Sequence, residues 1–409
     1  MPITPFRGLI NNTRDNYVYM SPDGNDSNTG EADSPVKSLK RALEIASVNG
    51  RGVFVKSGTY NLGDGFGTDP SNTYYDYYFS GAGKPYQGDQ WGNTDLLKSA
   101  FYYKTPILGE FVLYRELSNP NYTFTKTNDN SNSYFTIQVS PNPNFGIDEL
   151  KGKSLIVNGY NNLPAYCYRI IKNTADTIYA VSWLGGGTPT KISIYNCPTL
   201  QIPSGKTAWF DLFGFVMCNL NFEIIGNFYA YGTEFNDCYF FASTQKTIYA
   251  YESYNKVKSY FSQCLFNNIG IKASSSWGSG RLYRCAFRGA SSAMINISYA
   301  MNCSAWECGD FYQLDDGIFT DKILILFAGG QDNTGNFINI NTSGYKSSNA
   351  EILLRGSSST NDFTINIKDI QFANGYKISL DAIPYQLFAR KQATKLVENE
   401  DGLKIWISG

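Results

Sequence analysis

The sequence contains no histidine among its 409 residues. This absence excludes serine and cysteine hydrolases that depend on a histidine base, zinc peptidases of the HExxH type and general-base catalysis by imidazole. No CxxC pair occurs either, so the eight cysteines lack the usual spacing of a zinc site. We therefore expect neither a metal nor another cofactor.

An excess of charge of either sign is also missing. Lys and Arg together number 34 against 35 for Asp and Glu, which gives a net charge of -1 and no electrostatic footprint for nucleic acid. Residues 1–16 lack the basic start and apolar core of a signal peptide, and no apolar run reaches 18 residues. We expect a soluble protein that is synthesised in the cytoplasm and does not insert into a membrane.

What the sequence does have is a recurring phrase of cysteine and apolar residues. The copies are Phe235-x-x-Cys238-x-Phe240, Phe261-x-x-Cys264-x-Phe266 and Leu282-x-x-Cys285-x-Phe287, with looser copies at Phe215-x-x-Cys218-x-Leu220 and Ala300-x-x-Cys303-x-Ala305. The cysteines are 20, 26, 21 and 18 residues apart, and a period near 20 with short strands is typical of a solenoid. Alternation along a strand places each Cys and the residue two places on in the interior. The outward side then holds Asp237, Gln263, Arg284 and Asn302. The pattern predicts a parallel β-helix with a Cys ladder and a Phe ladder inside.

These five cysteines are expected to be buried, inert thiols, because free Cys in a core behaves as a small apolar residue. Cys167, Cys197 and Cys308 lie outside the repeat and have no predicted role.

The N-terminal segments predict a cap over the first coil. Residues 17–30 form a strand and a turn rich in Gly, Asn and Asp, and residues 52–60 form a second strand. Between them, Ser34 is expected to cap a helix that begins at Pro35 and is ended by Asn49 and Gly50. The apolar stripe of this helix is Val36, Leu39, Leu43 and Ala46. Such a cap would cover strand edges that the first coil leaves open.

In the order of residues 17–30, 34–43 and 52–60, the chain resembles the entrance of right-handed parallel β-helix proteins of the pectate-lyase-like superfamily. It is similar in particular to phage tailspikes and related proteins that bind surface polysaccharides. The resemblance covers residues 17–60 and, through the repeated phrase, residues 197–388. It implies an all-β fold, a place in the virion as part of a phage tail, a homotrimer, and other tail proteins as partners.

The chain is expected to divide into five parts. Residues 1–62 are the cap and first strands, 63–110 a loop region rich in aromatic residues and Gly, 111–196 an inserted small β-domain, 197–388 the parallel β-helix and 389–409 a C-terminal hairpin. The insertion is predicted from short strands at 135–139, 154–157, 167–171, 177–181 and 191–195. Its pattern Leu150-x-Gly-Lys-x-Leu-x-Val157 resembles small β-barrel insertions of phage tail proteins.

Without histidine, the chemistry open to a β-helix is glycan hydrolysis by two carboxyl groups, or β-elimination with a Lys, Arg or Tyr base. The densest acidic group, and the candidate catalytic set, is Glu307, Asp310, Asp315 and Asp316. The second choice is Glu234, Asp237 and Glu252. The alternative is that these are solvated turn residues, since Asp beside Gly is ordinary in turns.

Aromatic residues at outward positions are the candidates for glycan contact, because Tyr and Trp combine an apolar face with a polar edge. The candidates are Tyr239, Tyr249, Tyr251, Tyr254 and Trp306. The alternative is that such rings only stabilise the sheet by pairing across strands.

Three functions follow from these patterns. The first is a phage tailspike or tail-fibre receptor-binding protein that recognises a bacterial surface polysaccharide. The second is a polysaccharide depolymerase, a glycoside hydrolase or lyase, on the same β-helix. The third is a structural subunit of the virion with no role in glycan recognition.

Overall fold

The structure is a computed structural model. It describes residues 17–49, 51–65, 77–80, 105–128, 134–158, 166–181, 188–211, 215–251, 259–273, 280–295, 297, 299–314, 323–331, 338–341, 351–355, 365–368, 377–379, 394–398 and 404–408. The described part is mostly β-strand, with one helix.

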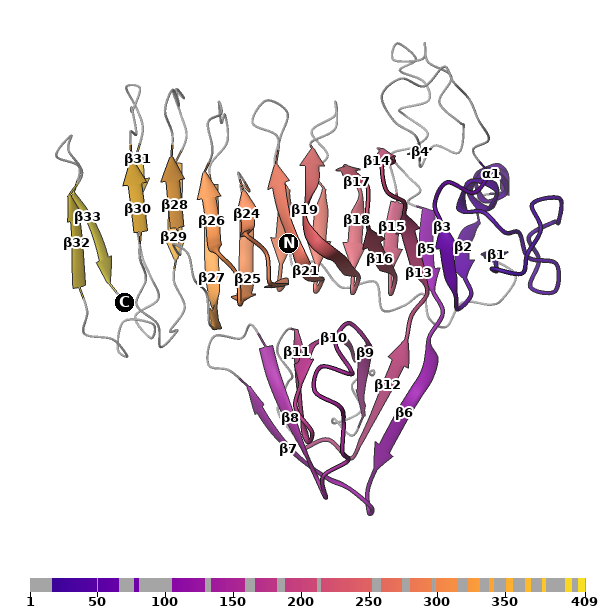
Figure 1. The fold of residues 1–409 in the computed structure, drawn as a ribbon, viewed down its shortest axis with the longest axis horizontal. Coiled ribbons are helices and arrows are strands. Elements are labelled where there is room, and N and C mark those ends of the chain that lie inside the picture. Colours follow the sequence, from indigo (N-terminus) through magenta and orange to yellow (C-terminus); the bar gives the residue numbers. More distant parts are fainter. Residues whose placement is uncertain are drawn as a thin grey trace, which may run out of the picture.

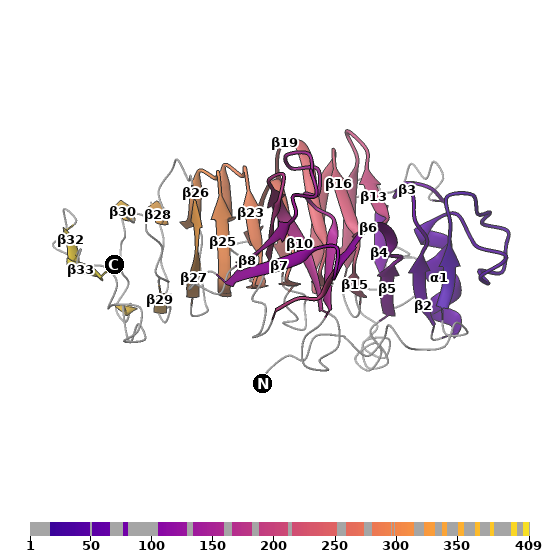
Figure 2. The same cartoon turned by 90° about the horizontal axis from the view of Figure 1, so that it is seen from below.

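Three ladders of parallel strands form the body of the molecule, and the chain visits them in turn (Figures 1 and 2). The first ladder contains β1 (Tyr17–Met20), β2 (Gly52–Val55), β5 (Thr105–Gly109), β15 (Phe215–Cys218), β18 (Glu234–Asn236), β20 (Tyr260–Ser262), β22 (Arg281–Tyr283), β25 (Tyr299–Trp306), β27 (Ile323–Gln331), β29 (Glu351–Arg355) and β31 (Lys377–Ser379). The second contains β3 (Thr59–Asn61), β13 (Thr199–Ile202), β16 (Asn221–Ile224), β19 (Tyr239–Tyr251), β21 (Leu265–Ala273), β23 (Ala286–Arg288) and the end of β25. The third contains β4 (Tyr77–Ser80), β14 (Thr207–Asp211), β17 (Asn227–Tyr231), the second halves of β19 and β21, β24 (Ser292–Ile295), β26 (Asp310–Leu314), β28 (Ile338–Asn341) and β30 (Ile365–Lys368). We call this the three-ladder body.

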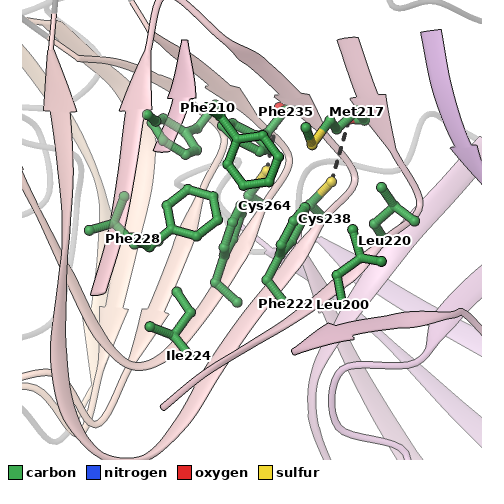
Figure 3. Close-up of a cluster of buried hydrophobic side chains, with 14 of the residues drawn as sticks. Leu200, Phe210, Met217, Leu220, Phe222, Ile224, Phe228, Phe235, Cys238 and Cys264 are labelled. Carbon is green, nitrogen blue, oxygen red and sulfur yellow. Dashed lines mark hydrogen bonds between the residues drawn. The ribbon is translucent and has the colours of Figure 1, made fainter. Parts of the chain in front are cut away.

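The interior of the body contains the predicted ladders of Cys and Phe. Cys238, Cys264, Cys285 and Cys303 are fully buried in one core cluster, and each thiol of the first three donates a hydrogen bond to a carbonyl of the previous coil. Figure 3 shows Cys238 and Cys264 among the surrounding apolar side chains. The Phe rings beside them stack nearly parallel. Their centroids are 4.8 Å apart for Phe222–Phe240, 5.0 Å for Phe240–Phe266, 4.8 Å for Phe266–Phe287 and 5.0 Å for Phe235–Phe261.

One member of the predicted Cys ladder is wrong. Cys218 pairs with Asn236, not with Cys238, and lies outside the core cluster that holds the other four. Phe235 pairs with Met217, so the copy of the phrase in that coil is Met217-x-x-Leu220-x-Phe222. The predicted and the observed alignment of the phrase both alternate apolar residues equally well. Only the residue to which each position pairs in the neighbouring strand distinguishes them.

The helix also begins later than predicted. Helix α1 (Leu39–Asn49) is capped by Ser38, whose hydroxyl accepts a hydrogen bond from the amide of Arg41 at 3.1 Å. The segment before it is extended, because the amide of Val36 bonds to the carbonyl of Tyr19 and the carbonyl of Val36 accepts from Ser21. Val36 and the apolar stripe of the helix are all buried against the end of the body, where the cap was expected.

Seven further strands form an antiparallel sheet below the body in Figure 1. They are β6 (Val112–Ser118), β7 (Thr123–Asn128), β8 (Tyr134–Ser140), β9 (Ser154–Asn158), β10 (Tyr166–Asn173), β11 (Thr177–Val181) and β12 (Lys191–Asn196). The sheet has its own core, which includes the fully buried Phe135, Ile137 and Leu155. At the C-terminus β32 (Thr394–Glu398) and β33 (Lys404–Ser408) pair antiparallel.

The seven-stranded sheet is inserted at a corner of the body. In one coil Leu108 of the first ladder and Thr199 of the second are partners of Cys218 and Asn221 in the next coil. Only Asn219 and Leu220 connect the ladders in that next coil, so residues 109–198 stand where a two-residue corner is sufficient. Asn219 adopts a φ of 58°, and the equivalent corner residues of the following coils, Asp237, Gln263 and Arg284, have φ values of 51° to 54°.

Candidate functional site

The outer face of the second ladder is covered by the seven-stranded sheet. Tyr239, Leu265 and Trp306 point out from the body, but they pack in one cluster with Ile171 and Val181 of the sheet. Tyr134 and Tyr179 contact the indole of Trp306 edge-on, with centroids 4.7 and 6.2 Å apart.

Two of the predicted glycan contacts therefore need correction. Tyr239 is 8% exposed and Trp306 is 1% exposed, and burial raises the pKa of the Tyr239 phenol. Both rings point outward as expected, but neither offers a face to a ligand, because the inserted sheet lies on them.

Two arginines tie the sheet to the body. Arg169 of β10 is completely buried, and its guanidinium donates to the carbonyls of Asp237 and Leu220, at 2.5 and 3.3 Å, and to Asn221 Oδ1 at 2.9 Å. Arg288 of β23 donates hydrogen bonds to Asp148, in the turn between β8 and β9, at 2.7 Å and to Glu307 at 2.8 and 3.2 Å. Charge-assisted, multiply bonded contacts of this kind fix an orientation.

Among the candidate catalytic residues, Glu307 lies directly after β25 with a φ of 54°, in a turn, and both of its carboxylate oxygens are bonded to Arg288. Asp310 is the first residue of β26, in register with Ser292. Asp315 and Asp316 lie outside the described residues. The described contacts therefore give Glu307 a part in joining the sheet to the body.

The outer face of the third ladder carries a column of aromatic side chains. Trp209 of β14, Tyr229 of β17 and Tyr249 of β19 are partners in successive strands. Their rings stack with centroids 5.0 Å apart at each step and interplanar angles of 21° and 15°. Tyr231 extends the group sideways, 5.4 Å from Trp209. We call Trp209, Tyr229 and Tyr249 the aromatic column.

Alternation along each strand points the aromatic column outward. Ala208 and Phe210 on either side of Trp209 are fully buried in the interior, as are the neighbours of Tyr229 and Tyr249. The three rings themselves are half-buried. Because their faces are stacked on one another, the rings present edges and not faces to the outside, and the indole Nε1 of Trp209 is itself buried.

A row of polar side chains lies along one side of the aromatic column. Thr207, Asn227 and Thr247 occupy the outward positions two residues earlier, and the Asn227 amide donates to the Thr207 hydroxyl at 3.3 Å. Register places Tyr251 beside Tyr231 on the other side, while Tyr254 lies outside the described residues. Burial, and to a smaller extent the neighbouring phenol of Tyr249, raises the pKa of Tyr229. Its hydroxyl is therefore protonated at neutral pH and can donate a hydrogen bond. Amide and hydroxyl groups beside aromatic rings provide what a neutral polar ligand such as a sugar chain requires.

In the part of the chain that the structure describes, no three acidic or cysteine side chains gather as metal ligands would. The one helix of that part is not long and apolar enough to cross a bilayer.

No protein-family model and no curated protein matches this sequence. Solved structures that resemble it include a glycoside hydrolase, at 9% identity and a TM-score of 0.20. The match covers 88% of this chain and 95% of the chain of the hydrolase. The Gp54 tailspike of Acinetobacter baumannii bacteriophage AP22, in complex with a capsular saccharide of that bacterium, has 9% identity, a TM-score of 0.19 and coverage of 83% and 72%. A tailspike protein from Pseudomonas phage LKA1 has 12% identity, a TM-score of 0.21 and coverage of 78% and 56%. Scores this low support no argument about fold or function.

Sequence reasoning found Tyr249 but missed Trp209 and Tyr229. The signal was present: the three residues are spaced 20 residues apart, and each stands between residues that are apolar or small. The aromatic column thus repeats with the period of the coils but in strands that carry no cysteine.

Proposed function

We propose that this protein binds a bacterial surface polysaccharide through the aromatic column on the third ladder. The observation that supports the proposal is the continuous row of Trp209, Tyr229 and Tyr249, half-buried and edge-exposed, with hydroxyl and amide groups along one side. Neighbouring strands are ~4.8 Å apart, so a glycan chain that crosses them meets a new ring and a new polar group at each step.

We further propose that the three-ladder body is a right-handed parallel β-helix and that the protein is a tailspike or tail-fibre component of a phage virion. The parallel pairing of every ladder supports the first part, and the resemblance of residues 17–60 to tailspike entrances supports the second. A homotrimer and contacts with other tail proteins belong to the same proposal. Sedimentation of the purified protein measures whether three chains associate.

The binding test uses an array of bacterial capsular and O-antigen polysaccharides. Trp209→Ala, Tyr229→Ala and Tyr249→Ala are each expected to weaken binding by roughly tenfold, because truncating an aromatic contact costs on the order of 1 to 2 kcal/mol. The matched control is Tyr283→Ala, which removes a half-buried tyrosine from the outer face of the first ladder. Unchanged binding by all three column variants contradicts the proposal.

The same preparations separate binding from catalysis. New reducing ends or unsaturated sugars in the polysaccharide after incubation with the wild type indicate a depolymerase. Binding without new ends supports a receptor-binding protein, and absence of both supports a purely structural subunit.

A further inference from the structure

We propose that the side chains of Lys153 and Asn196 join in a covalent isopeptide bond. Lys153 directly precedes β9 and Asn196 is the last residue of β12, so the bond links two neighbouring strands of the seven-stranded sheet. It lies where the chain leaves the sheet and returns to the body at β13, and it holds this end of the sheet together. The bond forms from the chain's own groups and is independent of any ligand of the aromatic column.

The register of the sheet sets the two residues opposite each other. β9 and β12 are antiparallel, and Ser154 is paired with Tyr195. Lys153 and Asn196 are the next positions in the same register. Lys153 Nζ donates a hydrogen bond of 2.8 Å to Asn196 Oδ1, at a partly buried place. Because a carbonyl bond is about 1.2 Å long, this contact sets Nζ roughly 3.5 Å from the amide carbon Cγ, at the edge of the range for a near-attack geometry.

The surroundings of Lys153 supply both a nucleophile and a base. The ring of Tyr114 lies over the ammonium group, with its centroid 4.4 Å from Nζ. Burial lowers the pKa of Lys153, although the charge of Glu149 acts against this shift, and a lowered pKa increases the share of the neutral, nucleophilic amine. Hydrogen bonds from the Tyr114 phenol and the Gly146 amide hold the pKa of Glu149 below its usual range. Glu149 is therefore a carboxylate at neutral pH and can accept a proton from Lys153.

The reaction exchanges one amide for another. The Lys153 nitrogen loses a proton to Glu149 and attacks Cγ of Asn196, so that the bond from Cγ to Nζ forms and the bond from Cγ to Nδ2 breaks. In total the lysine nitrogen gives up two protons and the departing nitrogen takes up two, so it leaves as an ammonium ion. No atom is oxidised or reduced, and no co-reactant is required. The product has lost one molecule of ammonia and one positive charge.

The test is the mass of the purified full chain in a denaturing solvent. Formation of the bond lowers the mass by about 17 Da, the mass of one ammonia, and digestion gives one branched peptide that contains both Lys153 and Asn196. The variants are Lys153→Arg, Asn196→Ala and Glu149→Gln. Lys153→Arg keeps the charge but replaces the amine by a guanidinium that does not lose its proton. Lys191→Arg is the matched control, because Lys191 lies in the same sheet and contacts the carboxylate of Glu116, at 2.7 Å, in place of an amide. Thermal melting confirms that each variant is folded.

We expect the mass loss and the branched peptide in the wild type and in Lys191→Arg, and neither in Lys153→Arg or Asn196→Ala. Glu149→Gln should form the bond on the order of 10² times more slowly, so that freshly purified chains are mostly unlinked. A wild-type mass equal to that of the sequence, with Lys153 and Asn196 in separate peptides, overturns the proposal. A loss of ammonia that persists in Lys153→Arg also overturns it, because the loss then comes from cyclisation of an asparagine alone. Complete linkage in fresh Glu149→Gln overturns the part assigned to Glu149.

Discussion

Phe266 illustrates how single residues hold the interior together. Its ring is fully buried between Phe240, 5.0 Å away, and Phe287, 4.8 Å away. Phe266→Ala removes both stacking contacts and leaves a cavity that neighbouring coils cannot fill, so we expect a loss of about 3 to 5 kcal/mol in the free energy of unfolding. Urea unfolding followed by circular dichroism measures it, with Tyr283→Ala as the control. A loss below about 1 kcal/mol would mean that the interior can collapse around the gap.

The ladder cysteines should be chemically inert in the folded protein. Cys238, Cys264 and Cys285 are fully buried, and burial raises the pKa of each thiol well above its ordinary value. Because the thiolate is the reactive form, we expect alkylation at these three to be slow in the native protein and fast in denaturant, with no disulfide among them. Mass spectrometry of labelled peptides measures the rates. Rapid native labelling of any of the three would contradict the register described above.

Burial of these thiols also makes the free energy of unfolding depend on pH in the alkaline range. The ladder thiols have a folded pKa above the unfolded one, so their contribution is complete below the unfolded value of 9.0 and is lost as pH rises beyond it. We expect the free energy of unfolding to fall above about pH 9. Urea midpoints at pH 7, 8 and 10 measure this, and replacing Cys238, Cys264 and Cys285 together by Ala should flatten the fall. An equally steep fall in that variant would assign the effect to other groups.

At the scale of elements, the repeat in the sequence was sufficient to predict the interior but not its full extent. The prediction for the phrase around Cys264 and Cys285 is confirmed, because the residues within the phrase keep the same spacing in the neighbouring coils and therefore pair position by position. Cys218 was assigned to the wrong face because the phrase placed two residues later, at Met217, Leu220 and Phe222, has the same apolar pattern. The helix start was wrong because Pro35 suits an extended segment as well as a first helical turn, and hydrogen bonds to β1 decide between them.

The outer faces were harder to predict, because what covers a strand comes from elsewhere in the chain. Trp306 and Tyr239 were correctly expected to point outward, yet the sheet of residues 112–196 buries them. Nothing in the local sequence of either residue records that contact. The aromatic column, by contrast, was readable from its period of 20, but its strands lack the cysteine that marked the repeat.

Glu307 belongs to the contact between two elements, and its substitution tests the catalytic prediction. With both carboxylate oxygens bonded to Arg288, Glu307→Gln should loosen the sheet on the body and leave any glycan cleavage at the wild-type rate. Proteolysis near β12 and a reducing-end assay measure the two effects. Asp310→Asn, Asp315→Asn and Asp316→Asn are assayed beside it. A fall of on the order of 10² or more in cleavage by Glu307→Gln would restore it as a catalytic acid or base.

At the scale of the whole molecule, the insertion at a two-residue corner suggests that the body folds without the seven-stranded sheet. Replacing residues 109–198 by Asn-Leu, the pair that turns the next coil at Asn219 and Leu220, should keep the β circular-dichroism signature. Loss of that signature would show that the sheet is required for the body to fold. The shortened protein should nevertheless self-associate, because Tyr239, Leu265 and Trp306 lose their cover. Adding Tyr239→Thr and Trp306→Thr should restore the oligomeric state of the full chain in sedimentation, since the exposed apolar surface is then removed while the corner remains the same.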